Sequence, residues 1–333
     1  MLLITGAPGW LCDAVLTLLA SKQIQARCLV QRSLPQSKLD AWRAEHREVN
    51  EVVPGDLEDV KSLEGACANL AGGSVLHAAG IIHPRRPSDW YRINRDGTLT
   101  LAKIAKAAGV RRFVYVSSNA AQGAASSRSQ VLTESMPSKP LSHYGISKYQ
   151  AEQGLLAMHQ PGVFEVVIAR PCMFYGPPVP ARHVDIFKRI KYGRLPLVGG
   201  GLYDRSLSYV DDLAAGIILC LNHPRAAGEV FTLCDSRVYS TLEVCEAMAA
   251  ALTVKPCYLR LPSICATTAW IIDRALNSVG LYNMPFHLLS EANWNVGCSN
   301  RKAAELLGFA PTVDIKEGYR RAVAWCREKK LLD

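Results

Sequence analysis

The amino-acid sequence predicts an α/β protein in which a doubly wound parallel sheet is followed by a smaller, mostly helical C-terminal lobe. Over the first 170 residues, short runs rich in leucine and β-branched residues alternate with longer helical patterns, which is typical of βαβ units. From residue 171 the alternation loosens, because four prolines within ten residues and a later triple glycine interrupt the chain. From residue 262 to the end the pattern is helical.

The individual elements follow from this alternation in chain order. Six strands are expected, at residues 2–5, 26–31, 49–53, 74–78, 112–117 and 165–169. Four helices are expected between them, at residues 10–20, 60–70, 95–108 and 143–159. Further on we expect a helix at 211–221, a strand at 230–234 and a helix at 241–251 with a serine or threonine cap. Asn300 is expected to cap a helix at 301–307, and a helix at 315–330 closes the chain.

Composition narrows the classes of function. The net charge is +9, but the basic residues are dispersed rather than gathered in runs, so we expect no nucleic-acid partner. The eleven cysteines lack the CxxC spacing of zinc sites, so we expect reduced thiols and no metal. Because the chain begins with a strand-like run and has no apolar run of membrane-spanning length, we expect a cytoplasmic location and no membrane partner.

A glycine-containing turn, TGAPGWLC, follows the first expected strand. Gly6 and Gly9 lie three residues apart where the strand passes into a helix. Glycine lets the backbone approach a pyrophosphate closely, and the amides of a helix N-terminus attract its charge. In this position the pair predicts a dinucleotide site that includes Pro8, Trp10 and Leu11.

Further motifs recur in a fixed order. Asp56 and Leu57 follow the third strand, the segment 78–80 (Ala78, Ala79, Gly80) follows the fourth, and Tyr144 and Lys148 form a YxxxK pair. This order resembles the extended short-chain dehydrogenase/reductase family, including its NAD-dependent epimerase/dehydratase branch, over nearly the whole chain. The resemblance implies a Rossmann fold in which the residues after the strands contact the cofactor.

The resemblance also implies a division of the chain. Residues 1–170 would form the NAD(P)-binding domain and residues 171–333 the substrate-binding lobe, with about 205–235 returning to the first domain. The family's third glycine is Cys12 here, which implies slightly wider packing of the first helix on its strand.

The end of the second strand indicates which dinucleotide is preferred. A carboxylate at this position binds free ribose hydroxyls, whereas an arginine accommodates a 2′-phosphate. Here Arg32 and Ser33 follow Gln31, and there is no carboxylate. We therefore expect NADP(H) to be favoured over NAD(H), with Arg32 as an ordinary surface residue being the alternative.

Tyr144 and Lys148 are four residues apart and hence on one face of a helix. A phenol is a poor base at neutral pH, and a nearby ammonium favours the phenolate by lowering the pKa. The resemblance places Ser118, with Ser117 as its neighbour, as the hydroxyl that hydrogen-bonds the reacting oxygen. It implies hydride transfer at the nicotinamide, with Tyr144 as acid/base and Lys148 binding the ribose and lowering the tyrosine pKa.

The resemblance places Pro171 and Met173 beside the cofactor, where the chain passes to the second lobe. Many nucleotide-sugar members have an asparagine at the position of Met173, and they have a phosphate-binding arginine in the region of Arg205. Arg205 could equally form an ion pair with Asp204 or Asp211. Apolar and aromatic residues in the last 70 positions favour a bulky hydrophobic substrate, as in the 3β-hydroxysteroid dehydrogenase-like and dihydroflavonol reductase-like branches.

The sequence thus predicts a ketone/alcohol oxidoreductase acting on a small-molecule substrate that is hydrophobic or nucleotide-linked. Two alternatives stay open at this point: a nucleotide-sugar epimerase, and a dinucleotide sensor that lacks catalysis. The resemblance further implies a homodimer formed through the helices that contain Asn94 and Tyr144.

Overall fold

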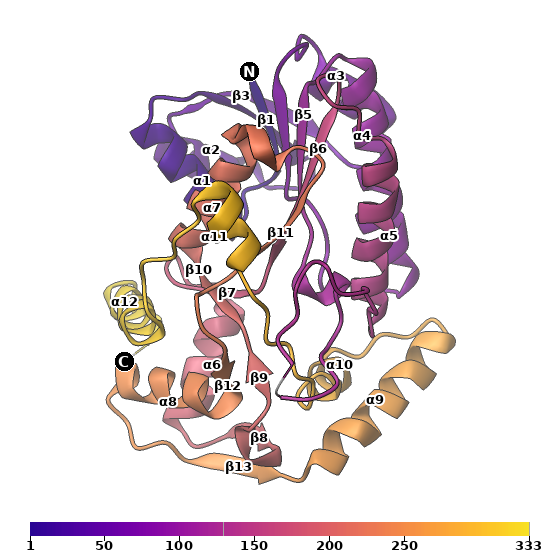
Figure 1. The fold of residues 1–333 in the computed structure, drawn as a ribbon. Coiled ribbons are helices and arrows are strands. Elements are labelled where there is room, and N and C mark those ends of the chain that lie inside the picture. The colour runs from indigo at the N-terminus through magenta and orange to yellow at the C-terminus, as the bar shows by residue number, and fades with distance from the viewer. Residues whose placement is uncertain (129, 333) are drawn as a thin grey trace.

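Seven parallel strands form the central sheet of the computed structural model, which describes residues 1–128 and 130–332 (Figure 1). Their order is β3-β2-β1-β4-β5-β6-β11. The strands are β1 (Leu2–Ala7), β2 (Ala26–Gln31), β3 (Val49–Gly55), β4 (Ser74–His77), β5 (Arg112–Val116), β6 (Glu165–Pro171) and β11 (Val230–Leu233). The order reverses between β1 and β4, which is the switch point where a doubly wound sheet binds ligands. The predicted fold class is confirmed.

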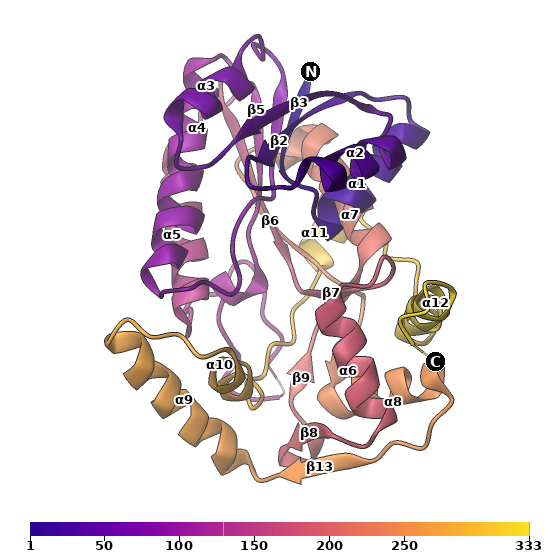
Figure 2. The same ribbon diagram turned by 180° about the vertical axis from the view of Figure 1, so that it is seen from behind.

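Helices cover both faces of this sheet (Figures 1 and 2). One face carries α1 (Trp10–Ser21), α2 (Gln36–Glu45), α7 (Val210–Asn222) and α11 (Arg301–Leu307). The other carries α3 (Val60–Cys67), α4 (Thr98–Ala107) and α5 (His143–Ala157). Successive side chains of a strand point to opposite faces, so Val114 packs into the first core and Phe113 into the second.

Two expected helices of this domain differ from the structure, and one helix was not expected. The helix expected at 95–108 is preceded by a π-helical segment, Trp90–Gly97, and α4 itself begins at Thr98. The helix expected at 60–70 ends at Cys67, because the chain turns extended at Ala68 and left-handed at Asn69. Helix α2 was not expected, since only Trp42 is buried along it and no apolar stripe marks it.

The second lobe is built from helices and short strand pairs. Its core lies between α6 (Ala181–Lys191), α8 (Thr241–Leu252) and α12 (Ile315–Glu328). The pairs are β7 (Met173–Tyr175) with β10 (Leu207–Tyr209), β9 (Asp204–Arg205) with β12 (Tyr239–Ser240), and β8 (Leu195–Val198) with β13 (Tyr258–Leu261). Two further helices, α9 (Ser263–Ser278) and α10 (Met284–Ser290), form an outlying hairpin, here called the cap.

The expected helix caps have different outcomes. Ser240 accepts a hydrogen bond from the Glu243 amide, and the Glu243 side chain accepts one from the Ser240 amide, so α8 begins with a full capping box. Asn300 is the N-cap residue of α11, as expected, but its side chain makes no capping hydrogen bond. The side-chain amide of Asn300 instead donates to the Cys234 carbonyl at 2.9 Å, which ties the start of α11 to the end of β11.

Candidate active site

The expected cofactor residues follow the carboxyl ends of neighbouring strands. Gly6 has φ +97°, and a Cβ there would lie 2.8 Å from the carbonyl carbon of Ala78 and from the amide nitrogen of Ala79. Gly9 is extended and begins α1, and a Cβ there would lie 2.4 Å from the Gly6 carbonyl oxygen. Neither position tolerates a side chain, so the β1 turn and the β4 turn present bare backbone beside the first amides of α1.

This arrangement fits a dinucleotide. The first-turn amides of a helix are unpaired within the helix and point at bound phosphate, and α1 begins directly after Gly9. The other expected contacts lie in the neighbouring turns. These are Pro8, Trp10 and Leu11 after β1, Arg32 and Ser33 after β2, Asp56 and Leu57 after β3, Gly80 after β4, and Pro171 and Met173 at the end of β6 and start of β7. Their contact with a cofactor stays a prediction.

Arg32 makes an ion pair that the sequence did not reveal. Its guanidinium lies 2.8 Å from a carboxylate oxygen of Asp59, the N-cap of α3, and the Arg32 side chain is largely exposed. A 2′-phosphate would therefore have to share Arg32 with Asp59. An exposed pair of this kind contributes little to stability, so the guanidinium stays available to a ligand.

The expected catalytic residues meet where β4 and β5 end. Ser142 accepts a hydrogen bond from the Gly145 amide at 3.3 Å and begins α5, which places Tyr144 and Lys148 one turn apart. Lys148 is buried, and its ammonium donates to the Val116 carbonyl at 3.0 Å. A Cβ at Gly80 would lie 3.3 Å from the Lys148 Nζ, so the ammonium lies directly beside the expected cofactor turn.

Ser118 faces Tyr144, and Ser117 is buried. The Ser118 hydroxyl accepts a hydrogen bond from the Ala120 amide at 3.1 Å and donates one to the Asn119 side chain at 3.4 Å. It is also close enough to Tyr144 to lower the pKa of that phenol. Ser117 Oγ is buried and has no hydrogen-bond partner among the described residues. The geometry therefore agrees with Ser118, rather than Ser117, as the hydroxyl beside the tyrosine.

Burial dominates the protonation of Tyr144. It raises the pKa of Tyr144 to about 12, against the lowering effect of the Ser118 hydrogen bond. Two charged side chains from the second lobe act on the same hydroxyl: Glu291 raises the pKa and Arg182 lowers it. The net direction is opposite to the lowering by Lys148 that we expected from the sequence, because desolvation disfavours a buried phenolate. Tyr144 is thus held protonated at neutral pH, as a proton donor.

The burial of Lys148 predicts a pH dependence of the free energy of unfolding. Burial lowers the pKa of Lys148 to about 8 from 10.5, and nearby Glu152 opposes this shift. Between these values the unfolded chain binds the proton that the folded chain has lost, so the free energy of unfolding rises with pH. We expect wild type to gain up to about 1.4 kcal/mol per pH unit relative to Lys148→Met in this window. Denaturant unfolding of both proteins at several pH values measures the gain, and a difference that does not change with pH would contradict it.

His77, near the candidate site, joins secondary-structure elements through hydrogen bonds of its ring. The buried His77 ring bridges Thr5 Oγ1 at 2.6 Å and Thr98 Oγ1 at 2.8 Å, joining β4 to β1 and α4. Burial and the neighbouring Lys148 ammonium lower the pKa of His77 to about 3. His77 is therefore neutral and structural.

The cap packs against the segment of residues 83–90 through aromatic contacts that were not apparent from the sequence. Tyr282 donates or accepts a hydrogen bond at 2.7 Å with His83 and packs edge-on against Trp90 at 5.2 Å. The buried His287 ring lies 3.3 Å from an Asp273 carboxylate oxygen and 5.7 Å from Trp90. These residues are distant in sequence and share no motif, so only the tertiary structure brings the cap to the side of Tyr144.

Arg205 binds backbone carbonyls rather than forming the ion pair that the sequence left open. Its guanidinium donates to the backbone carbonyls of Asp204 at 2.8 Å, Ala292 at 2.9 Å, Glu291 at 3.3 Å, and Trp294. Burial lowers the pKa of Arg205 to about 10. The side chain binds the carbonyls that follow α10 and so anchors the cap to β9, instead of forming an ion pair with Asp204 or Asp211.

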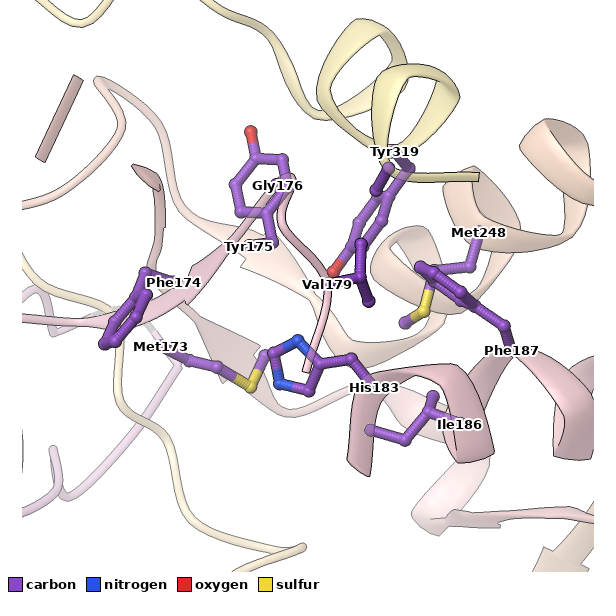
Figure 3. A pocket seen from close by; sticks show the side chains of 11 residues that line it. Met173, Phe174, Tyr175, Gly176, Val179, His183, Ile186, Phe187, Met248 and Tyr319 are labelled. Atoms are coloured by element: carbon purple, nitrogen blue, oxygen red, sulfur yellow. The ribbon is translucent and has the colours of Figure 1, made fainter. Parts of the chain in front are cut away.

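A small apolar cavity lies within the second lobe (Figure 3). Side chains of β7, α6, α8 and α12 line it, and its volume is about 30 Å³, room for one or two waters. The Trp10 ring packs 4.6 Å from Phe174 and 5.1 Å from His183 at its edge. The cavity is too small for a substrate, and the Trp10 contacts join the first turn of α1 to the second lobe.

Comparison with known proteins identifies the class. Residues 2–234 match the NAD dependent epimerase/dehydratase family, so the chain belongs to this family within the extended short-chain dehydrogenases/reductases. Its members are NAD(P)-dependent enzymes that include epimerases, dehydratases and reductases. Within the described residues, none of the helices combines the length and apolar character needed to cross a membrane.

Relatives with different reactions resemble this chain. A Sinorhizobium fredii protein of unassigned function, y4nL, is 38% identical over 343 residues, covering 98% of this chain and 95% of the relative. The UDP-glucose 4-epimerase of Vibrio cholerae is 30% identical over 262 residues, covering 74% of each. The ceramide reductase of Caulobacter vibrioides is 29% identical over 333 residues, covering 97% and 93%.

A solved structure shows the same fold. The dTDP-glucose 4,6-dehydratase DesIV of Streptomyces venezuelae, with NAD bound, superposes with a TM-score of 0.78 at 24% identity, covering 99% of this chain and 97% of that one.

Proposed function

We propose that this protein transfers hydride between NADP(H) and a bulky hydrophobic ketone or alcohol, with Tyr144 as the acid/base. The observation that carries the proposal is the buried Lys148 ammonium beside the Gly80 backbone, one helical turn from Tyr144, with the Ser118 hydroxyl close enough to influence the Tyr144 pKa. In the reducing direction Tyr144 donates its proton to the carbonyl oxygen, and Ser118 donates a hydrogen bond to the same oxygen. The bound nicotinamide supplies the hydride and both of its electrons. Solvent then returns a proton to Tyr144.

Lys148 supplies a fixed positive charge to the candidate site. Its Nζ is held by the Val116 carbonyl and lies beside the backbone of Gly80, at the turn where a cofactor ribose would lie. A positive charge there stabilises the phenolate that forms when Tyr144 gives up its proton. Burial lowers the pKa of Lys148 to about 8, which is still above neutral pH, so most of the side chain remains a charged ammonium there.

Two observations support a hydrophobic substrate over a nucleotide sugar. Met173 has 46% of its surface exposed at the start of the second lobe and cannot donate hydrogen bonds to a phosphate. Arg205 is engaged by four backbone carbonyls. The similarity to ceramide reductase spans the chain, and a Stigmatella aurantiaca ketoreductase of a farnesylated quinoline oxide is 30% identical over 235 residues.

Epimerisation is the second candidate, supported by the similarity to UDP-glucose 4-epimerase. A nicotinamide absorbance assay separates the two. Bulky apolar ketones should oxidise NADPH with net loss of the reduced-nicotinamide band, whereas an epimerase converts UDP-sugars with no net change. UDP-sugar conversion without any ketone reduction would replace the proposed function. Turnover of neither substrate class, with dinucleotide still bound, would indicate a sensor.

Arg32 should set the cofactor preference. We expect Arg32→Ala to weaken NADPH binding by about 10- to 100-fold, the range for a lost hydrogen bond to a charged group, and to leave NADH binding unchanged. Isothermal titration with both dinucleotides measures this. Ser37→Ala, in the exposed first turn of α2, is the control. Tighter binding of NADH than of NADPH by wild type would overturn the NADP(H) preference and leave the proposed chemistry intact.

A further inference from the structure

The outer surface of the cap, taken together with the adjoining strand β13, is unusually apolar. Eight large apolar side chains between residues 259 and 288 are exposed: Leu259, Ile264, Ile271, Val279, Leu281, Met284, Phe286 and Leu288. No separate stretch of 30 residues in the described part of the chain carries more than three. Exposed apolar side chains are common one at a time, but a concentrated group marks an interaction site.

Helix α9 buries small and polar side chains and exposes large apolar ones, the reverse of an ordinary amphipathic surface helix. Its fully buried positions are small or polar: Ala266, Ala269, Asp273 and Asn277. Ile264 and Ile271, by contrast, are 65% and 58% exposed. A surface helix normally buries its largest apolar side chains against the core. In both ribbon views α9 forms the outer edge of the second lobe, with α10 between it and the rest of the molecule (Figures 1 and 2).

The charges around this surface have one sign. Between residues 255 and 290 the exposed charged side chains are Lys255, Arg260 and Arg274. The single carboxylate of this stretch, Asp273, is buried against His287. The loop that holds His83 against Tyr282 adds exposed Arg85 and Arg86. The surface therefore combines apolar side chains with positive charge and carries no exposed negative charge in these two segments.

We propose that the outer surface of the cap, residues 259–288 with Arg85 and Arg86, docks this protein on an anionic lipid surface. An interfacial helix places apolar side chains among the acyl chains and basic side chains at the headgroups. A second copy of the chain fits less well, because a twofold axis through the surface would bring basic residues against each other. This contact differs from membrane spanning, and it revises the expectation of no membrane partner.

Docking would also explain where the cap lies. Glu291 follows α10 directly and acts on the Tyr144 hydroxyl, so the lipid-facing cap borders the candidate catalytic residues. A water-insoluble ketone could then pass from the bilayer to Tyr144 without crossing water. This consequence rests on the proposed function, whereas the docking itself does not.

Vesicle flotation tests the docking independently of activity. The probes are vesicles of phosphatidylcholine alone and of phosphatidylcholine with phosphatidylglycerol, and the proteins are wild type and Ile264→Ser/Ile271→Ser. We expect wild type to float with the anionic vesicles and the double variant to have a bound-to-free ratio lower by about tenfold. Val163→Ser is the matched control, because Val163 is 63% exposed on the turn before β6, far along the chain from the cap.

The outcomes separate the possibilities. An unchanged melting temperature and an unchanged dinucleotide titration show that the double variant is folded. Failure of wild type to bind anionic vesicles, or equal binding by the double variant, would overturn the proposal. A wild-type dimer in light scattering that the double variant converts to monomer would also overturn it, in favour of a second copy. Vesicle binding by a protein that reduces no ketone would sustain the docking and reject only the proposed function.

Discussion

Replacing Tyr144 with phenylalanine is expected to lower kcat by about 10²- to 10⁴-fold, the range for loss of a positioned proton donor. The change removes one hydroxyl from a partly buried side chain and leaves its ring in place. Because burial raises the pKa of Tyr144 to about 12, the wild-type residue carries its proton across the physiological range. The variant has no proton to give to the carbonyl oxygen.

The measurement is a steady-state assay of ketone reduction together with dinucleotide titration. Dinucleotide affinity should stay within about twofold of wild type, because the expected phosphate contacts lie at Gly6, Gly9 and the start of α1. Tyr149→Phe, which removes the same hydroxyl five residues further along α5, is the matched control and should keep wild-type turnover. If Tyr144→Phe retains more than about a tenth of wild-type kcat, the acid/base lies elsewhere.

Arg170→Met is expected to lower the free energy of unfolding by about 3–5 kcal/mol, because it leaves a buried carboxylate without its partner. The guanidinium of Arg170 contacts both Glu152 carboxylate oxygens, at 2.9 Å and 2.5 Å, and both side chains are almost fully buried. It also donates to Gln122 and, at 3.2 Å, to Ser138. This one side chain therefore joins β6, α5 and the loop between β5 and α5.

Denaturant unfolding of single and double variants isolates the cause. Arg170→Met/Glu152→Leu should be less destabilised than Arg170→Met, since neither charge then remains in the interior. Arg320→Met breaks an exposed pair with Glu317 at 2.7 Å and should change stability by no more than about 0.5 kcal/mol. A double variant at least as unstable as Arg170→Met would show that packing around β6, rather than the unpaired charge, sets the loss.

Local patterns explain why much of the Rossmann domain could be predicted. Apart from the edge strand β3, the six predicted strands of the sheet are buried along nearly their whole length, so each appears in the sequence as an apolar run between turns. Helix α2 lacked such a signal, because Trp42 is its only buried residue. The strand pairs of the second lobe are two to four residues long, which is too short for an alternating pattern to be recognised.

Some residues of the candidate site could likewise be identified from the sequence, and others could not. Gly6 could be identified because a strand-to-helix turn that presses against Ala78 and Ala79 requires a residue without a side chain. Arg182 and Glu291 could not, since they reach Tyr144 from α6 and from beyond α10 with no motif linking them. Arg205 was misjudged because its partners, the carbonyls after α10, are backbone atoms and carry no signal in the sequence.

By itself, the sequence determined the doubly wound sheet, the glycine turn and the spacing of Tyr144 and Lys148, because hydrophobic period, backbone freedom and helical repeat act between residues close in the chain. Only the tertiary structure decided the protonation of Tyr144, the anchoring of the cap by Arg205 and the outward-facing apolar surface of α9. Desolvation and packing depend on which distant segments surround a group. The sequence around Ile271 would be the same whether this side chain faced the core or, as in the structure, the solvent.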